Sequence, residues 1–514
     1  MNAPEKKFED LLNLDSITGI EKQKQIDILG LLFDGAIDNN SSEAIEKGLL
    51  FSKEIKYSSL TGIQKTLFHY YISNAWATKR RFKSKTFEGA WEFNMEEQAY
   101  EIYHLRKAIT ISAFNKLPAN RKTQIYVNLA NAFNVVGRFV EAHEYWDKAL
   151  LIDPTHSMAL SNKGKGYFYY GKYLFDEVHI KIFMIFAVKE LKKSLKNPEE
   201  FYPPVLKEAT EFANWFDTFI DKSTQENPPD LNEYSLGEDL ALKKYREWSL
   251  NFQLYINPLN DLGPFTVACH DCLNMPTLFF LADQPPTYIT LYNQMKQEYG
   301  TARFLFYESQ NVTEPHYSDT DIVITDSQEG ALYSYNLEKL KTSFRMCYSI
   351  LDKISFLLED YFELGIPKTK INFRTIWTNE SKALRPQFVM SNNWALRGLY
   401  WLSKDLYYPS QNHEIVIEPE AREIAAIRNH IEHKSFKIIA DDKILKTAYN
   451  KKKDIAYTIS KSEFEQKALK LLKLVRAAMI YLPLAINDEE KKSNKVKGPS
   501  APVMPRIIPL TEKT

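Results

Sequence analysis

Residues 123–156 read TQIYVNLANAFNVVGRFVEAHEYWDKALLIDPTH, and this stretch decides the fold class of the N-terminal half. Ala130 and Phe133 fall on one face of a first predicted helix, and Trp146 lies in a second. Gly137 suits the turn between the two helices. A small residue beside an aromatic one lets neighbouring helices nest closely. The stretch therefore predicts a pair of antiparallel helices.

The length of this unit, and Pro154 at its end, make it resemble a tetratricopeptide (TPR) repeat, whose period is about 34 residues. The motif NAF at 131–133 is echoed upstream by NAW at 74–76. We therefore expect TPR-like helical repeats over residues 1–195, with an ordinary helical bundle as the alternative. Weaker units are expected in three other segments, which are residues 157–190, the surroundings of 74–76, and 17–57.

A change of composition marks the end of the predicted repeats. The charged stretch Lys189–Glu200 is followed by a segment rich in Pro, Asn and Asp at 224–237. Beyond it, short runs of β-forming residues predict a small mixed α/β region over residues 196–335. These runs are FTVAC (265–269), ARFLFYE (302–308) and DIVITD (321–326).

The C-terminal part returns to a helical period. Apolar residues recur at spacings of three and four from Leu337 to Tyr361, which predicts one long amphipathic helix. A four-helix bundle is expected over 336–486, and a Lys- and Pro-rich tail over 487–514 is expected to be disordered. The fold class is thus mainly α. The other three bundle helices are expected at about 393–407, 419–434 and 463–483.

Composition excludes several functional classes. The 514 residues carry 66 basic and 66 acidic side chains, so the net charge of zero argues against a protein that coats nucleic acid uniformly. Only 17 residues are Gly, and the sequence has no P-loop, dinucleotide fingerprint, HExxH or GxSxG motif. We expect no cofactor. Three cysteines do not form a disulfide framework, and the apolar runs are too short to span a membrane, so a cytoplasmic protein is expected.

Cys269-His-Asp-Cys272 has the CxxC spacing of redox and zinc sites. A zinc site needs four ligands, and Cys347 is the only other cysteine. We therefore expect a buried structural role and no metal site. A lesser alternative is a pocket that His270 and Asp271 form with the turn-rich segment NPLNDLG (257–263).

The third bundle helix ends with RNHIEHK at 428–434, in which four residues separate Arg428 from His433. This spacing alone is weak, because Arg138 and His143 repeat it inside the TPR-like unit, where we interpret it as a chance match. Two features distinguish the later match. Asn429 follows its arginine directly, and the motif lies late in a helical bundle.

Arg, a polar residue and a later His resemble the motif of the HEPN superfamily of helical-bundle proteins. The resemblance covers about residues 337–485. The chain is also similar to a branch of the superfamily in which TPR-type repeats precede the HEPN domain. Three segments carry that second likeness, which are YREWSLNFQLYINPLNDLG (245–263), YSILDKISFLLEDYFELGI (348–366) and WALRGLYWLSKDL (394–406).

The resemblance implies a metal-independent ribonuclease in which the ribose 2′-OH attacks the adjacent phosphate, leaving a 2′,3′-cyclic phosphate and a 5′-OH. His433 would transfer the proton, because histidine titrates near neutral pH. Arg428 would hold phosphate oxygens with its planar fork, and Asn429 would orient the histidine or bind phosphate. HEPN enzymes commonly place two motifs across a dimer cleft, so the single motif predicts a homodimer.

Three further residues are candidate supporting groups. Asp352, in the first bundle helix, is expected to face the motif as polar residues of that helix do in HEPN proteins, or else to face solvent. His430 is a possible second acid or base, and Arg397 would reach the bundle interior or an RNA phosphate. The structural alternative for the motif is a charged helix end, in which Glu432 pairs with Arg428 and His433 interacts with the helix dipole.

Local charge supports an RNA substrate. Residues 434–497 contain 16 Lys or Arg against 8 Asp or Glu, which predicts a basic edge beside the motif. The leading hypothesis is a ribonuclease in antiviral defence or a toxin-like response, with an unknown protein partner bound to the repeats. The alternatives are a non-catalytic TPR-HEPN scaffold and an RNA- or nucleotide-binding regulatory subunit, for instance of a nucleotidyltransferase.

Overall fold

The computed structural model describes residues 3–83, 91–220, 222–226, 228–281, 285–311, 315–325, 330–406, 416–442, 456–492 and 500–503. Within these ranges the chain is mainly helical, which confirms the predicted fold class. The described helices of the N-terminal part are α1 (Ala3–Leu12), α2 (Lys22–Asp38), α3 (Ser42–Glu54), α4 (Gly62–Lys83), α6 (Glu96–Thr110), α7 (Ala119–Val135), α8 (Phe139–Ile152), α9 (Ser157–Tyr173) and α10 (Glu177–Ser194).

The later helices are α11 (Pro203–Phe216), α12 (Lys222–Glu226), α13 (Leu240–Asn251), α14 (Thr287–Gln310), α15 (Tyr335–Tyr361), α16 (Pro386–Val389), α17 (Trp394–Ser403), α18 (Ala421–His433) and α20 (Lys461–Lys492). Short 3-10 turns occur at η1 (Tyr57–Ser59), η2 (Ser112–Lys116), η3 (Pro198–Glu200), η4 (Pro258–Asp261), η5 (Thr266–Ala268), η6 (Tyr317–Asp319), η7 (Lys368–Lys370) and η8 (Lys404–Leu406). Strands β1 (Leu278–Leu281) and β4 (Ser500–Val503) pair antiparallel, and β2 (Ser435–Ile439) pairs in parallel with β3 (Ala456–Ser460).

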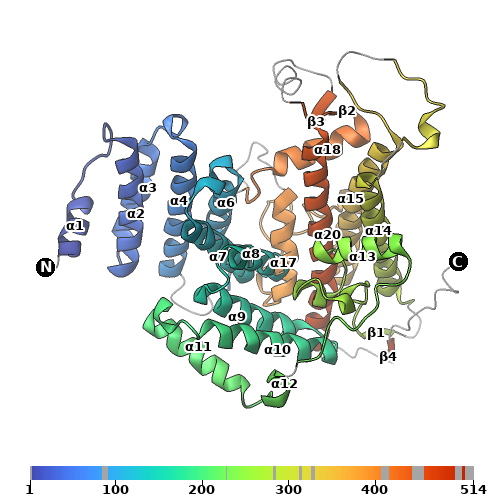
Figure 1. The fold of residues 1–514 in the computed structure, drawn as a ribbon, viewed down its shortest axis with the longest axis horizontal. Helices are drawn as coiled ribbons and strands as arrows, with labels where there is room; N and C mark the ends of the chain where they lie inside the picture. Colours follow the sequence, from blue (N-terminus) through green and yellow to red (C-terminus); the bar gives the residue numbers. More distant parts are fainter. Residues whose placement is uncertain are drawn as a thin grey trace.

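The N-terminal half is built from packed helix pairs, as TPR-like repeats require. The pairs are α2 with α3, α4 with α6, α7 with α8, and α9 with α10, and they extend from the blue end of the molecule toward its centre (Figure 1). Gly137 makes the turn between α7 and α8 with a φ of 83°, a conformation that favours glycine. Phe133 and Trp146 are buried between these helices and their neighbours. The helical structure is consistent with the predicted repeats.

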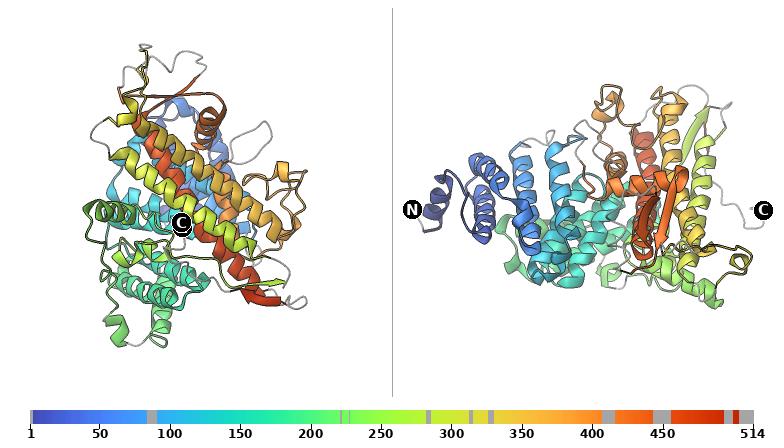
Figure 2. Two further views of the ribbon diagram at one scale, coloured as in Figure 1. Left: turned by 90° about the vertical axis from the view of Figure 1, so that its right-hand side faces the viewer. Right: turned by 90° about the horizontal axis from the view of Figure 1, so that it is seen from above.

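The C-terminal bundle contains one helix more than the sequence predicted. Helices α14, α15 and α20 run side by side (Figure 2, left), and α17 and α18 pack on them. The predicted strand at 302–308 is wrong, because these residues belong to α14 and bury Ala302 and Phe306 on one face of it. The other two predicted strands are also absent from the described residues, since 265–269 contains η5 and 321–325 is irregular. Helix α20 continues to Lys492, beyond the expected start of the tail.

The two halves meet backbone to backbone. Gly137 in the turn between α7 and α8 lies against Gly398 in α17, and a Cβ atom on either glycine would overlap the other half's backbone. The Trp394 indole donates to the carbonyl of Asn134 at 2.9 Å. The Tyr481 hydroxyl of α20 accepts a hydrogen bond from the Val140 amide at 3.0 Å. The turn between α7 and α8 therefore belongs to the same hydrophobic core as the bundle.

A buried charge cluster lies beside this glycine contact. The Asp405 carboxylate of η8 accepts paired hydrogen bonds from Arg106 of α6, at 2.6 and 2.9 Å, and from Arg138, at 2.7 and 2.8 Å. Arg106 also pairs with Glu418, just before α18, at 3.1 Å. Arg138 thus has a structural partner, and His143 is buried with its ring stacked 4.3 Å from that of Tyr167. Arg138 and His143 thus have separate structural contacts, which agrees with a chance match of their spacing.

The strands β2 and β3 close the bundle beyond the end of α18, and they are seen in red and orange from above (Figure 2, right). Their inner residues Ile438 and Ile459 are buried. Among the described helices, none has the length and apolar character that crossing a bilayer requires.

Candidate active site

Helix α18 presents the Arg-Asn-x3-His motif on its exposed face. Its apolar residues Ile424, Ile427 and Ile431 recur at three and four, and all three are buried against the bundle. The helix ends at His433, because Lys434 is extended (φ −141°, ψ −170°) and leads directly into β2. The buried stripe therefore fixes which residues of the helix reach solvent.

Arg428, Asn429, His430 and His433 line one open cleft of about 740 Å³. On a helix that turns about 100° per residue, Arg428 and His433 point about 140° apart. They nevertheless line the same cleft, because the cleft extends across the exposed face of α18 and takes side chains from both sides of that face. The remaining lining residues are Tyr348, Leu351, Asp352, Asn372, Phe373, Arg374, Leu406, Arg422, Ala425, Ala426 and Glu432.

Asp352 of α15 faces the motif rather than open solvent. Its carboxylate accepts a hydrogen bond from the Arg428 guanidinium at 3.1 Å, and that guanidinium lies 5.0 Å from the centre of the Tyr348 ring. Burial raises the pKa of Asp352, and Arg428 and the Phe373 amide oppose this shift. The same carboxylate thus contacts both the motif helix and the loop that forms the opposite wall.

The two histidines of the motif region differ in their surroundings. Nδ1 of His430 lies 2.7 Å from the carbonyl of Ala426, so we assign a proton to Nδ1, and Nε2 is the nitrogen left to exchange a proton with a ligand. The His430 ring lies 5.5 Å from that of Tyr457 in β3. His433 is exposed, and among the described residues its ring has no hydrogen-bond partner. Its imidazole is therefore accessible to a substrate hydroxyl.

The structural alternative for the helix end is wrong in one respect. Glu432 pairs with Arg345 of α15 at 3.4 Å and not with Arg428. Arg345 also donates to the carbonyl of Ile431 at 2.9 Å. The motif arginine therefore keeps Asp352 as its acidic partner.

Arg397 does not belong to the cleft. It is fully buried in α17, where it donates to the carbonyls of Val135 at 3.0 Å and Glu92 at 2.6 Å. Its guanidinium lies 5.2 Å from the centre of the Trp91 ring, and burial lowers the pKa of Arg397 to about 10. The expectation that it contacts an RNA phosphate is wrong, because α17 turns this residue toward the repeats.

Two cleft arginines were missed by the sequence analysis. Arg422 lies seven residues before Asn429 and eleven before His433, so the three share one stripe of α18, and this spacing could have identified it. Arg374 comes from the irregular segment between η7 and α16, where no periodicity points to it.

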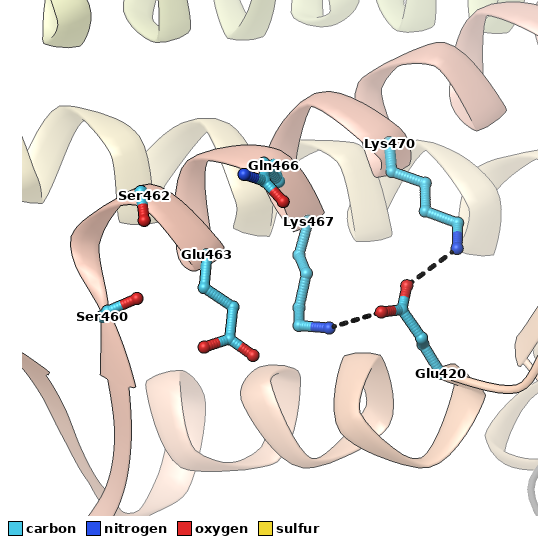
Figure 3. Close-up of a pocket in the computed structure, with 7 residues that line it drawn as sticks. All are labelled: Glu420, Ser460, Ser462, Glu463, Gln466, Lys467 and Lys470. Carbon is cyan, nitrogen blue, oxygen red and sulfur yellow. Dashed lines mark hydrogen bonds and ion pairs between the residues drawn. The ribbon is translucent and has the colours of Figure 1, made fainter. Parts of the chain in front are cut away.

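Most of the basic side chains of the predicted edge that the structure describes pair with acids. In α20, Lys473 pairs with Glu144 at 3.1 Å and Arg476 with Asp261 at 2.5 Å. Lys467 and Lys470 both reach Glu420, at 3.3 and 3.0 Å, in a separate hollow of about 410 Å³ (Figure 3). The other lysines of the edge at 443, 446, 451–453, 495 and 497 lie outside the described residues.

The CxxC segment has a structural role. Asp271 pairs with Arg303 of α14 at 2.8 Å and accepts a hydrogen bond from the Ile256 amide at 2.7 Å. All three cysteines are free thiols, and burial raises the pKa of Cys272 to about 12. A thiol held protonated in this way is a poor nucleophile. No group of three metal-binding side chains occurs in the part of the chain that the structure describes.

Comparison with known proteins assigns the C-terminal half. Residues 281–489 match the model of the family described as LA2681-like HEPN. Neither the curated proteins nor the solved structures include a match to the chain. The matched range begins before α14, which agrees with the packing of that helix in the bundle, and it contains the whole cleft. Residues 281–489, which carry Arg428, Asn429 and His433, are therefore similar to the LA2681-like family and form a C-terminal domain of the HEPN superfamily.

Proposed function

We propose that the protein is a metal-independent endoribonuclease whose active site is the α18 cleft. The observation that carries this proposal is the shared cleft itself, because an arginine, an asparagine and two histidines of one HEPN helix open onto the same solvent-filled space. HEPN domains are associated with nuclease and nucleotide-related functions, and this association supports the proposal.

RNA supplies its own nucleophile, so the site needs only a base, an acid and a cation. His433 takes the proton from the 2′-OH as its oxygen bonds to phosphorus. The bond from phosphorus to the 5′-oxygen breaks, and that oxygen takes a proton from a second acid, for which His430 is the candidate within the cleft. The products are a 2′,3′-cyclic phosphate and a 5′-OH. DNA lacks the nucleophile and is not cleaved.

Arg428 stabilises the charge that develops on phosphorus. A guanidinium has five N–H donors in a fixed plane, and the hydrogen bond to Asp352 uses one side of that plane. The remaining donors are left to bind phosphate oxygens. Asp352 therefore acts as a positioning residue, and Asn429 binds the phosphate or orients the histidine from the next position along α18.

A homodimer is part of this proposal. The motif face of α18 is exposed, and the described residues hold one copy of the motif in a cleft. A second copy facing it would place two motifs about one substrate-binding cleft. Mass photometry tests this assembly, and a strict monomer that still cleaves RNA would contradict it.

The repeats are proposed to bind a protein partner through α2 and α3. Leu31 and Ile37 of α2 and Leu50 of α3 are exposed apolar side chains. The inner end of the repeat array is already packed against the bundle, which leaves the outer end as the more open surface for a partner. The proposal includes a cytoplasmic location, which rests on the cysteine content and the short apolar runs of the sequence. It also includes a setting in antiviral defence or a toxin-like response, which rests on the family resemblance.

The decisive experiment incubates the purified full-length protein with RNA in EDTA. The wild type is expected to release fragments with cyclic-phosphate ends, and the His433→Ala and Arg428→Ala variants are not. RNA binding without cleavage, under every condition including added nucleotides and divalent ions, would instead support the non-catalytic scaffold or the regulatory subunit.

A further inference from the structure

Arg422 is a cation without a partner among the residues that the structure describes. It is the second residue of α18, it is exposed, and it lines the cleft. Among the described residues its guanidinium has neither an ion pair nor a hydrogen bond. Other arginines of the bundle do have partners, since Arg428 binds Asp352 and Arg476 binds Asp261.

Its isolation is notable because three glutamates surround it in the sequence. Glu418 pairs with Arg106 and Lys470, Glu420 with Lys467 and Lys470, and Glu423 with Lys467 at 2.6 Å. All three carboxylates thus turn toward α20 and the repeats, and Arg422 turns into the cleft. The lysine contacts of Glu420 are drawn in Figure 3.

Its position on α18 also argues against a stabilising role. A cation in the first turn of a helix interacts unfavourably with the helix dipole. An exposed arginine that neither pairs nor suits the dipole contributes little to folding, but it keeps its donors available in the cleft. A ligand with negative charge is what such a side chain binds best.

The distance to the motif suits a second phosphate. Arg422 precedes Arg428 by six residues, which places their Cα atoms about 9 Å apart along the helix axis. It lies on the stripe of Asn429 and His433, so a strand that crosses the motif can continue along the same face of α18. Consecutive phosphates of one RNA strand are therefore within reach of the two arginines.

We propose that Arg422 binds a phosphate that neighbours the scissile phosphate, so that the cleft recognises an extended RNA strand and not a single phosphodiester. This inference rests on the proposed function for the identity of the scissile phosphate. Arg422 acts in binding and positioning, and it takes no part in the proton transfers.

The test compares two substrates. One is a DNA pentamer with a single central ribonucleotide, which has one cleavable phosphate flanked by others. The second is a dinucleoside monophosphate, which has the cleavable phosphate alone. For the pentamer, Arg422→Ala is expected to lower kcat/KM about 10-fold, mainly through KM, because one charged hydrogen-bonded contact is lost. For the dinucleoside monophosphate the variant is expected to equal the wild type.

Two further readouts separate a phosphate contact from a structural effect. The slope of log kcat/KM against log salt concentration should become shallower by about 0.7, the value for one contact to a single strand. Arg422→Lys should restore most of the activity on the pentamer, because it keeps the charge. Lys341→Ala, which removes a cation of α15 that pairs with Glu338, is the control and should change neither substrate.

Equal losses on both substrates, or no loss on the pentamer, would overturn the proposal. A binding measurement tests the phosphate contact of Arg422 independently of the proposed ribonuclease activity. Fluorescence anisotropy with a 2′-O-methyl RNA pentamer, which is not cleavable, should show weaker binding by Arg422→Ala. If the wild type binds this RNA but cleaves nothing, and the variant still binds more weakly, the ribonuclease proposal fails and the phosphate contact stands. If the wild type binds no RNA, both fail.

Discussion

Arg428 of α18 donates a hydrogen bond to Asp352 of α15 across 3.1 Å, and the same carboxylate is raised in pKa by its partial burial. Its partner loop contributes the Phe373 amide as a second donor. The Asp352 carboxylate thus contacts both the motif helix and the opposite wall of the cleft, although partial burial destabilises its ionised form. A group held at such a cost is expected at a functional position.

Loss of either motif residue should abolish cleavage. Changing His433 or Arg428 to Ala removes proton transfer or transition-state charge stabilisation, so kcat on RNA should fall by about 100-fold or more. His430→Ala should cause a smaller loss. Cleavage is followed by gel electrophoresis in EDTA. His179→Ala in α10, outside the cleft, is the control and should retain full activity.

Asp352→Asn should slow cleavage without weakening the fold. Burial raises the pKa of Asp352 above its value in the unfolded chain, so its ionised form costs stability at neutral pH, and this cost disappears below about pH 4. The variant should melt at the same or a higher temperature. Its kcat should fall about 10-fold, because Arg428 loses its orienting partner. Differential scanning calorimetry and single-turnover cleavage measure the two effects.

Asp360→Asn, two turns further along α15 near its C-terminal end, is the matched control for that experiment. Asp360 accepts a hydrogen bond from the Tyr288 hydroxyl at 2.8 Å and lies outside the cleft. Its change should leave kcat unaltered. A marked loss of melting temperature in Asp352→Asn would show that the carboxylate is structural.

Asp405→Ala should destabilise the whole molecule. It removes the shared partner of Arg106 and Arg138, and breaking a buried pair of this kind costs about 3–5 kcal/mol. Urea unfolding measures this loss. Glu338→Ala, which breaks an exposed pair with Lys341, should cost less than about 1 kcal/mol.

The contribution of Asp405 should also depend on pH. Burial alone would raise its pKa, but Arg106 and Arg138 hold the pKa of Asp405 well below its usual range. Its stabilising effect is therefore present above the unfolded value of about 4 and is lost as the pH falls toward the folded value. The difference in unfolding free energy between wild type and Asp405→Asn should narrow below about pH 4. A difference that grows on acidification would contradict this assignment.

Gly398→Ala should loosen the contact between the two halves. The added methyl group would overlap the backbone of Gly137, and overpacking of this kind costs about 1–3 kcal/mol or more. Gly300→Ala in α14 is the matched control, because a Cβ there meets no atom within 4 Å. Alanine in that helix interior should be neutral or stabilising by up to about 1 kcal/mol. Equal changes in the free energy of unfolding for the two substitutions, measured in urea, would argue against a close contact between Gly137 and Gly398.

Periodicity was sufficient to predict the helices that bury one continuous stripe. The predicted helices at 337–361 and 419–434 correspond to α15 and α18, because their apolar residues recur at three and four. The segment 302–308 was wrongly predicted as a strand, since its aromatic and β-forming residues suit either structure. Packing against α15 and α20 decides in favour of the helix, and Phe304 is left exposed on its outer face.

The site could be predicted in part. The motif helix and the facing position of Asp352 followed from the sequence and the family resemblance. The surroundings did not, because ion pairs such as Lys473 with Glu144 join residues that are far apart in the chain. For the same reason a count of charges over 434–497 could not show which described lysines pair with acids, and nothing in the sequence showed that Arg397 turns toward Val135.

The contact between Gly137 and Gly398 bears on how such a protein can change over generations. A side chain at either position would meet backbone atoms of the other half, so neither glycine can be replaced while the halves stay this close. A set of repeats taken from another protein would have to bring a glycine in its turn to make the same contact with α17. New partner specificity should therefore be more easily acquired at the outer repeats than by exchange of the whole array.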